Sequence, residues 1–315
     1  MRRLVAAGFL AVCLAAGVAA QQAPIFRGAT ETVPVYVTVT DKDSRLVTTL
    51  AREDFLLRDN GRAQEISVFD NSPQPIRLIV MLDVSGSMYG NLGLLRAASN
   101  QLFARLRPDD QVRVGSFGAE ITISPTFTNE RSALDAALPA DIPSSAPTPL
   151  WAALDTALDG FGDATGRKVV LVLSDGKDSG QVRVGKGFFT LIQVMERAQR
   201  EEVMIYAVGL RSRGRGGMPG GGRGVFNPAQ GLADDLPDAG LGKLALETGG
   251  GYFEIRPSDD LPAAFERVMD ELHSQYLLGF APPDRDGKRH KIEVKLVPKN
   301  LTARARKNYV APEPR

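Results

Sequence analysis

Three short segments of the chain carry side-chain oxygens whose spacing would suit a metal ion. Asp83, Ser85 and Ser87 alternate in Asp-Val-Ser-Gly-Ser, Thr148 lies in Pro-Thr-Pro-Leu, and Asp175 lies in Ser-Asp-Gly. Mg²⁺ and related hard cations such as Mn²⁺ and Ca²⁺ prefer oxygen ligands, and Mg²⁺ tends to keep bound waters. No His or Cys, the ligands typical of zinc, stands at these positions. Because three of the five groups are neutral hydroxyls, a carboxylate from a partner could complete the shell of a bound cation.

Apolar runs beside these segments predict the strands that would bring them together. Residues 76–82 form a nearly continuous apolar run that ends at Asp83, and residues 168–173 form another that ends just before Asp175. Such runs are typical of strands buried on both faces. In an open α/β sheet, ligands bind outside the carboxyl ends of the strands, where the strand order reverses. We therefore expect the two carboxylates to face each other across that crevice, with Thr148 just ahead of a helix.

The middle of the chain alternates between strand and helix patterns. We predict strands at 76–82, 112–117, 121–127, 168–173, 203–210 and 252–255, and helices at 92–106, 150–161, 188–200, 241–247 and 261–273. The segments 112–117 and 121–127 should form a hairpin. This order predicts an α/β fold with a doubly wound, mostly parallel sheet covered by helices on both faces.

Both ends of the chain are rich in strand signals instead. The predicted strands there are 33–40, 50–57, 64–69, 275–280, 290–296 and 301–309. Short sheets need partners to be stable, so we expect the two ends to pair as one small β-rich module beside the α/β core. The expected divisions are a signal peptide (1–20), a β-rich N-terminal segment (21–75), the α/β domain (76–272, with a Gly/Arg-rich loop insertion at 211–238) and a β-rich C-terminal segment (273–315).

The order of the oxygen-bearing segments resembles the metal-ion-dependent adhesion site of von Willebrand factor type A (VWA) domains. The resemblance covers about residues 76–272, and all five motif positions are filled. It implies that the two serines coordinate the cation directly, that the threonine does so directly or through water, and that the two aspartates act mainly through water. The flanking segments are similar to exported bacterial proteins of the VWFA-related type, which implies little about function.

Ordinary structural roles are the alternative for these residues. Serines after a strand commonly cap the following helix, and a threonine ahead of a helix can do the same. Catalysis fits the sequence poorly, because a dehalogenase-like phosphatase needs a second aspartate where Ser85 stands, and serine hydrolysis needs a histidine base. The two histidines, His273 and His290, lie outside the motif in positions that suit structural or solvent-facing roles. No Walker-type phosphate loop occurs, and we assign no catalytic residue.

The N-terminal residues predict export. Arg2 and Arg3 precede an apolar stretch, and small residues ending at Ala20 suit a signal peptidase. An uncleaved N-terminal anchor is the alternative. The only cysteine, Cys13, lies in this segment, so the mature chain would have no disulfide. We expect a periplasmic or secreted protein without a transmembrane segment after cleavage.

An Arg/Gly-rich stretch follows the predicted strand at 203–210, so it should emerge at the same edge of the sheet as the metal-ligand segments. A solvated, flexible insertion is its ordinary interpretation. We predict in addition that its arginines help to hold an acidic partner, and these are Arg211, Arg213, Arg215 and Arg223.

The net charge of +1, from 38 basic and 37 acidic residues, provides no global attraction to nucleic acid. The sequence therefore predicts an exported, metal-dependent protein-binding (adhesion or interaction) module, in which a partner's Asp or Glu carboxylate completes the shell of a Mg²⁺ (or Mn²⁺ or Ca²⁺) ion. The alternatives are a metal-independent structural or assembly module of the cell envelope and an unrecognised metal-dependent hydrolase.

Overall fold

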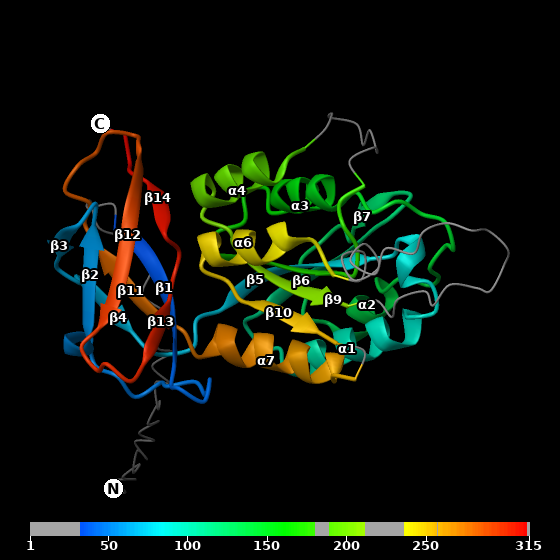
Figure 1. The fold of residues 1–315 in the computed structure, drawn as a ribbon, viewed down its shortest axis with the longest axis horizontal. Helices are drawn as coiled ribbons and strands as arrows, with labels where there is room; N and C mark the ends of the chain where they lie inside the picture. Colours follow the sequence, from blue (N-terminus) through cyan, green and yellow to red (C-terminus); the bar gives the residue numbers. More distant parts are fainter. Residues whose placement is uncertain (1–31, 180–188, 212–235, 257, 314–315) are drawn as a thin grey trace, which may run out of the picture.

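The protein has an α/β core at one end and a β-rich module at the other (Figure 1). The computed structural model describes residues 32–179, 189–211, 236–256 and 258–313. The predicted signal segment and most of the Arg/Gly-rich stretch lie outside these residues. Within the described ranges, no helix combines the length and the apolar character needed to cross a membrane.

A six-stranded sheet forms the middle layer of the core, and all its neighbouring strands are parallel except the β6–β7 pair. In spatial order the strands are β10 (Tyr252–Ile255), β9 (Met204–Leu210), β8 (Arg167–Ser174), β5 (Ile76–Asp83), β6 (Gln111–Phe117) and β7 (Ile121–Ile123). From β5 the chain builds outward through β6 and later, on the other side, through β8. The strand order therefore reverses between β5 and β8, where open α/β sheets bind ligands.

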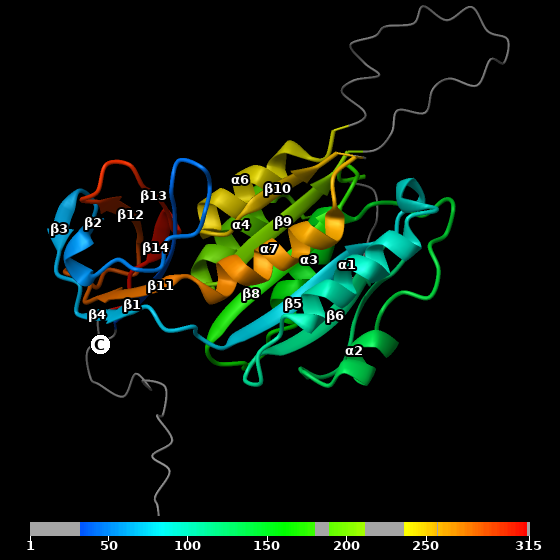
Figure 2. The same ribbon diagram turned by 90° about the horizontal axis from the view of Figure 1, so that it is seen from below.

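Helices cover both faces of this sheet, as predicted. The helices are α1 (Leu92–Ala104), α2 (Arg131–Ala136), α3 (Leu150–Asp159), α4 (Leu191–Arg200), α6 (Ala239–Thr248) and α7 (Leu261–His273). Helices α3, α4 and α6 lie on one face and α1 and α7 on the other (Figure 1), and α1 and α7 run side by side in the second view (Figure 2).

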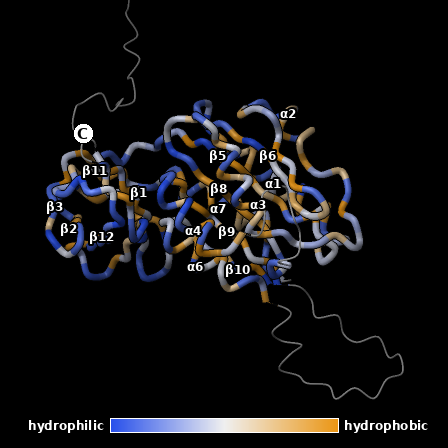
Figure 3. Tube along the Cα trace, turned by 90° about the horizontal axis from the view of Figure 1, so that it is seen from above, coloured by the Kyte–Doolittle hydropathy of each residue, from blue (hydrophilic) through white to orange (hydrophobic). Residues whose placement is uncertain are grey.

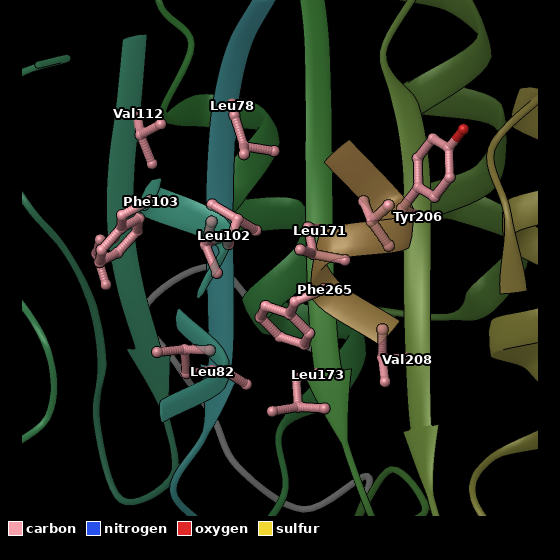
Figure 4. Close-up of a cluster of buried hydrophobic side chains, with 14 of the residues drawn as sticks. Leu78, Leu82, Leu102, Phe103, Val112, Leu171, Leu173, Tyr206, Val208 and Phe265 are labelled. Carbon is pink, nitrogen blue, oxygen red and sulfur yellow. The ribbon is translucent and has the colours of Figure 1, made fainter. Parts of the chain in front are cut away.

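The side chains of β5 explain why its sequence is a continuous apolar run. Leu78 and Leu82 pack into the cluster beneath α1 and α7 (Figure 4), whereas Ile79 and Met81 pack into the cluster beneath α3 and α4. All four side chains are fully buried. Hydrophobic colour accordingly follows the central strands through the core (Figure 3). A strand covered on both faces loses its polar positions, which is the pattern that the sequence shows.

Both ends of the chain build the β-rich module, which confirms that prediction. One four-stranded sheet has the order β13 (Thr302–Arg304), β1 (Val33–Thr40), β11 (Tyr276–Phe280), β4 (Val68–Asp70). The other has the order β14 (Asn308–Val310), β12 (Arg289–Leu296), β2 (Phe55–Asp59), β3 (Arg62–Gln64). The two sheets share one apolar core, to which both the first and the last strands contribute. Each short sheet thus gains the partner that its stability requires.

Several predicted elements at the ends differ from the observed ones. The expected strand at 50–57 begins as a 3-10 helix, Arg52–Asp54, because the Asp54 carboxylate accepts the backbone N–H of Ala51 at 2.9 Å. The expected strand at 301–309 is two short strands, β13 and β14, that belong to different sheets. Helix α2 was not predicted, since a six-residue helix with only Leu134 buried has almost no periodic signal.

A buried polar network joins the module to the core. The side-chain amide of Gln275, just after α7, donates to the hydroxyls of Thr38 at 2.7 Å and Tyr206 at 3.2 Å. The guanidinium of Arg304 contacts the carboxylate of Glu271, which is 2% exposed. The polar groups buried at this junction therefore form hydrogen bonds and ion pairs with one another instead of with water, as is usual for buried polar groups.

Candidate metal centre

The Asp83 carboxylate links the ends of the two strands that flank the crevice. Leu82 of β5 pairs with Leu173 of β8, so the two strands end at the same level. One oxygen of Asp83 accepts the backbone N–H of Ser85 at 2.8 Å, and the other accepts the hydroxyl of Ser174. The side chain is fully buried. These two hydrogen bonds hold the carboxylate in one orientation beneath the loop.

The two serines of the loop face each other and Asp175. The Oγ atoms of Ser85 and Ser87 are 3.1 Å apart, and the Ser87 hydroxyl donates to Oδ1 of Asp175 at 2.7 Å. Ser85 precedes the 3-10 helix Gly86–Met88, but its side chain makes no capping hydrogen bond. The capping alternative therefore does not describe these serines. Their hydroxyls meet a carboxylate from another strand instead.

Thr148 lies beside Gly176, the residue that follows Asp175. The residue that caps helix α3 is Pro149, so the Thr148 hydroxyl does not serve as a helix cap. A Cβ atom built on Gly176 would lie 3.1 Å from Oγ1 of Thr148 and 3.7 Å from Oγ of Ser87. Both hydroxyls thus border one small space, which stays open because residue 176 has no side chain.

Burial makes this site electrostatically unusual. Burial raises the pKa of Asp83 to about 6, although hydrogen bonds from Ser174 and Ser85 oppose the rise. Burial also raises the pKa of Asp175, which is 4% exposed. No lysine or arginine among the described residues forms an ion pair with either carboxylate. Among the residues that the structure describes, these two desolvated acids therefore lie together without a compensating cation, an arrangement that a bound cation would stabilise.

The donor set fits a hard divalent cation. The structure brings together two carboxylates and three hydroxyls, all of them oxygen donors of the kind that Mg²⁺, Mn²⁺ and Ca²⁺ accept. The described part of the chain contains no group of three or more His, Cys, Asp or Glu side chains that could hold a metal. A metal site here would consequently depend on the hydroxyls as well as the acids.

A groove of about 480 Å³ extends from Ser87 and Asp175 across the neighbouring strand ends. Its other walls carry apolar, basic and acidic side chains, among them Leu94, Arg211, Arg256 and Asp259. The groove opens beside the candidate ligands, so a peptide segment bound in it could contact the groove walls and a metal at the site.

The structure distinguishes among the predicted partner-binding arginines. The guanidinium of Arg211 contacts the carboxylate of Glu254, which offsets its charge. The other three predicted arginines lie outside the described residues. Arg256, which the sequence analysis missed, lines the same groove and has no ion pair within the described ranges. Its signal in the sequence is its place directly after β10, at the edge of the sheet that carries the site.

The histidines lie apart from these residues. Nε2 of His273 is 2.8 Å from the carboxylate of Asp110, and buried His290 lies 3.0 Å from Asp59 inside the β-rich module. Both therefore have structural partners, and neither contacts the candidate ligands. Ser174, which orients Asp83, was not assigned from the sequence although it directly precedes Asp175.

Several proteins of known structure are similar to this chain. BatB from Bacteroides thetaiotaomicron is 16% identical, with 62% of this chain and 98% of that chain covered and a TM-score of 0.44. The domain of the type V pili tip protein Mfa5 from Porphyromonas gingivalis is 13% identical, with 63% and 95% covered and a TM-score of 0.44. A von Willebrand factor type A protein from Catenulispora acidiphila is 14% identical, with 82% and 74% covered and a TM-score of 0.45.

No curated protein matches the chain. The family model for the von Willebrand factor type A domain, in contrast, matches residues 78–266, which include the β5 loop, Thr148 and Asp175. This span is more than half of the sequence and contains the whole six-stranded sheet except Ile76 and Arg77, the first two residues of β5. The chain therefore belongs to the von Willebrand factor type A domain family.

Proposed function

We propose that the protein is an exported module that binds another protein through a divalent cation held at the β5–β8 crevice. Its ligands would be Asp83, Ser85, Ser87, Thr148 and Asp175. The partner would supply an Asp or Glu carboxylate. Mg²⁺ is the cation we favour, with Mn²⁺ and Ca²⁺ as substitutes.

The observation that carries this proposal is the pair of buried acids, which have no lysine or arginine partner in the described part of the chain. A carboxylate buried without a counter-charge destabilises the fold, and such groups are normally paired or bound to a metal. Asp83 and Asp175 are both nearly inaccessible, and they are linked through the loop, since Ser85 donates to Asp83, Ser87 donates to Asp175, and the two serine hydroxyls are 3.1 Å apart. Structural demands alone would be met better by asparagine or serine at either position.

When bound, the cation would supply a positive coordination position that accepts an anionic oxygen from outside the protein. The chain's own residues would fix the orientation of that position. Ser174 and the backbone of Ser85 hold Asp83, and Ser87 links the loop to Asp175. Because the hydroxyl ligands are neutral, the two acids provide all the negative charge on the protein side.

The groove supports binding of a protein segment rather than a small ion alone. Leu94 is 40% exposed at its wall, and Arg256 adds a positive charge that forms no ion pair within the described ranges, although the carboxylate of Asp259 lines the same groove. A partner segment with an acidic residue beside an apolar one would suit both features. The predicted role of Arg211, and of the three arginines outside the described residues, belongs to this proposal too.

Export is a separate part of the proposal and is supported by the sequence of residues 1–20. The division into residues 21–75, 76–272 and 273–315 is supported by the separate apolar cores of the module and the α/β core. Cleavage after residue 20 is measurable as the N-terminal sequence of the protein recovered from the envelope or the medium.

A metal titration tests the central claim. Protein stripped of metals with a chelating resin should gain thermal stability on addition of MgCl₂ or MnCl₂, because ligands that bind only the folded state stabilise it. Asp175→Asn should lose this gain. Asp109→Asn, at an exposed position outside the site, should retain it.

Identical responses of wild type and Asp175→Asn would refute metal binding at this site. The chain would then act without metal, as a structural or assembly module. A partner captured from envelope extracts should be released by chelator if the proposal holds. A partner retained in chelator would contradict the bridging carboxylate.

A further inference from the structure

A second candidate site lies at the opposite end of the parallel sheet, where the β-rich module meets the core. A cavity of about 110 Å³ is bounded by β1 of the module and by the starts of β8 and β9. Arg167, the first residue of β8, lines it, whereas the last residue of that strand, Ser174, orients Asp83. The cavity is therefore separated from the candidate metal centre by the full length of the strand.

Arg167 is a buried cation without a direct counter-charge. It is 5% exposed, and its guanidinium donates to the backbone oxygen of Leu272 at 2.6 Å and to the side-chain oxygen of Gln275. Both acceptors are neutral. Its Nε atom has no hydrogen-bond partner among the described residues. Asp110 attracts Arg167 electrostatically only from a distance. The carboxylate of Asp110 contacts His273 instead.

The neighbouring Arg304, whose side chain is 25% exposed, has a carboxylate partner in this junction. Its guanidinium contacts the carboxylate of Glu271 directly. A buried charge that lacks such a partner destabilises the folded state. Burial accordingly lowers the pKa of Arg167, and charges of neighbouring groups only partly oppose this.

Acidic residues in the cavity wall do not supply the missing charge. Glu201 is bonded to Arg197 at 2.7 Å, and Glu202 is bonded to Arg306 at 2.9 Å. Each is thus committed to an arginine other than Arg167. Lys168 also lines the cavity and has no ion pair within the described ranges. The uncompensated charge of the wall is positive.

Tyr36 completes the lining from the side of the module. Its ring lies under the guanidinium of Arg167, with 4.6 Å between the guanidinium carbon and the ring centroid. Its hydroxyl makes no hydrogen bond to any described residue, so it remains available as a donor. A phenol, an ammonium and a guanidinium are each donors that recognise a carboxylate or phosphate group, and the three residues that carry them all line this cavity.

We propose that this cavity binds a small oxyanion, a carboxylate or phosphate group, between Arg167, Lys168 and Tyr36. A single water needs about 10–15 Å³ of such space, so the cavity has room for an anion of a few heavy atoms but not for a nucleotide or a peptide. Because Tyr36 belongs to the module and both cations belong to the core, the anion bridges the two. Binding therefore stabilises their junction.

The test uses sodium phosphate and sodium malonate as probes on the full chain, after metals are removed with a chelating resin. Calorimetric titrations are made at constant ionic strength against sodium chloride. Saturable binding with a rise in the unfolding temperature is expected for at least one probe. Binding of phosphate alone, of malonate alone, or of both probes then identifies which class of oxyanion the site accepts.

Matched variants locate the site. Tyr36→Phe keeps the ring under Arg167 and removes only the hydroxyl, so affinity should fall about tenfold or more, as expected for a hydrogen bond to a charged group. Lys168→Gln should weaken binding similarly. Lys243→Gln, at an exposed position on α6 outside the cavity, should leave affinity unchanged.

Two results would overturn the proposal. One is the absence of saturable binding for both probes. The other is that Tyr36→Phe and Lys168→Gln bind the probes with the same affinity as the control Lys243→Gln. The anion would then be an adventitious ion bound elsewhere on the protein. Circular dichroism of each variant confirms that it folds before its affinity is compared.

Discussion

Replacing Asp83 with asparagine should make the metal-free protein more stable while abolishing its response to divalent cations. The carboxylate is fully buried and has no cationic partner among the described residues. Its neighbours are the backbone N–H of Ser85 and the hydroxyl of Ser174. Asparagine can serve both, because its oxygen accepts from the N–H and its amide donates to the hydroxyl.

The magnitude follows from the pKa. Burial raises the pKa of Asp83 from 3.8 to about 6 in the folded protein. Since each pKa unit corresponds to 1.36 kcal/mol, the ionised carboxylate destabilises the fold by about 3 kcal/mol at neutral pH. Because the folded pKa is the higher one, this destabilisation is complete above about pH 6 and is relieved as pH falls toward 3.8. We expect Asp83→Asn to raise the free energy of unfolding by about 1–3 kcal/mol. Each kcal/mol should raise the unfolding temperature by about 2–4 °C.

Urea unfolding followed by fluorescence of Trp151, the only tryptophan, measures this change. The wild type and Asp83→Asn are compared in metal-free buffer at about pH 7.5 and about pH 4.5, on either side of the folded pKa. The advantage of the variant should shrink at the lower pH, where the wild-type carboxyl is protonated. Saturating MgCl₂ should stabilise only the wild type.

Asp110→Asn is the matched control, because Asp110 is equally buried but paired. Its carboxylate accepts N–H groups of Ile76 and Arg107 and contacts His273. Burial raises the pKa of Asp110. The hydrogen bonds from His273 and the backbone lower it by a larger amount, so the net shift of the pKa is downward. Asp110→Asn should therefore destabilise the fold. If Asp83→Asn did so too in metal-free buffer, our account of Asp83 as an uncompensated charge would be wrong.

Three further changes test the α/β core, its junction with the β-rich module, and the module itself. Gly250→Ala should cost about 1–3 kcal/mol or more, since a Cβ there would lie 2.0 Å from the carbonyl oxygen of Ile205; thermal unfolding measures the loss. Glu271→Gln should cost about 3 kcal/mol, because it leaves the guanidinium of Arg304 without its counter-charge, and a smaller loss for the double change Glu271→Gln with Arg304→Met would confirm the coupling. Burial lowers the pKa of His290 but two neighbouring carboxylates raise it more, so its stabilising contribution is full below 6.5 and is lost as pH rises through the folded pKa. His290→Gln should remove this part of the pH dependence in urea unfolding, and an unchanged profile would contradict it.

Local sequence determined most of the core. The apolar runs that became β5 and β8 are buried on both faces, so their composition alone identified them as central strands. Helices α1, α3 and α7 followed from periodicity to within a few residues. The ends of the chain were harder, because strands of three residues, such as β13 and β14, carry too few positions for a pattern.

The sequence by itself supplied the chemistry of the candidate metal centre: five oxygen-bearing residues in a family-typical order, at the ends of predicted strands. Only the tertiary structure decided that Ser87 meets Asp175 across 88 positions of chain, and that no described cation accompanies the two acids. It alone revealed the unpaired charge of Arg167, whose position on β8 reads like that of any strand residue. The physical reason is that the residue types determine which chemical groups are available, and the local periodicity of apolar residues determines which face of a helix or strand each side chain occupies. Whether a charge is compensated depends on neighbours that are distant in sequence, and these are set by packing.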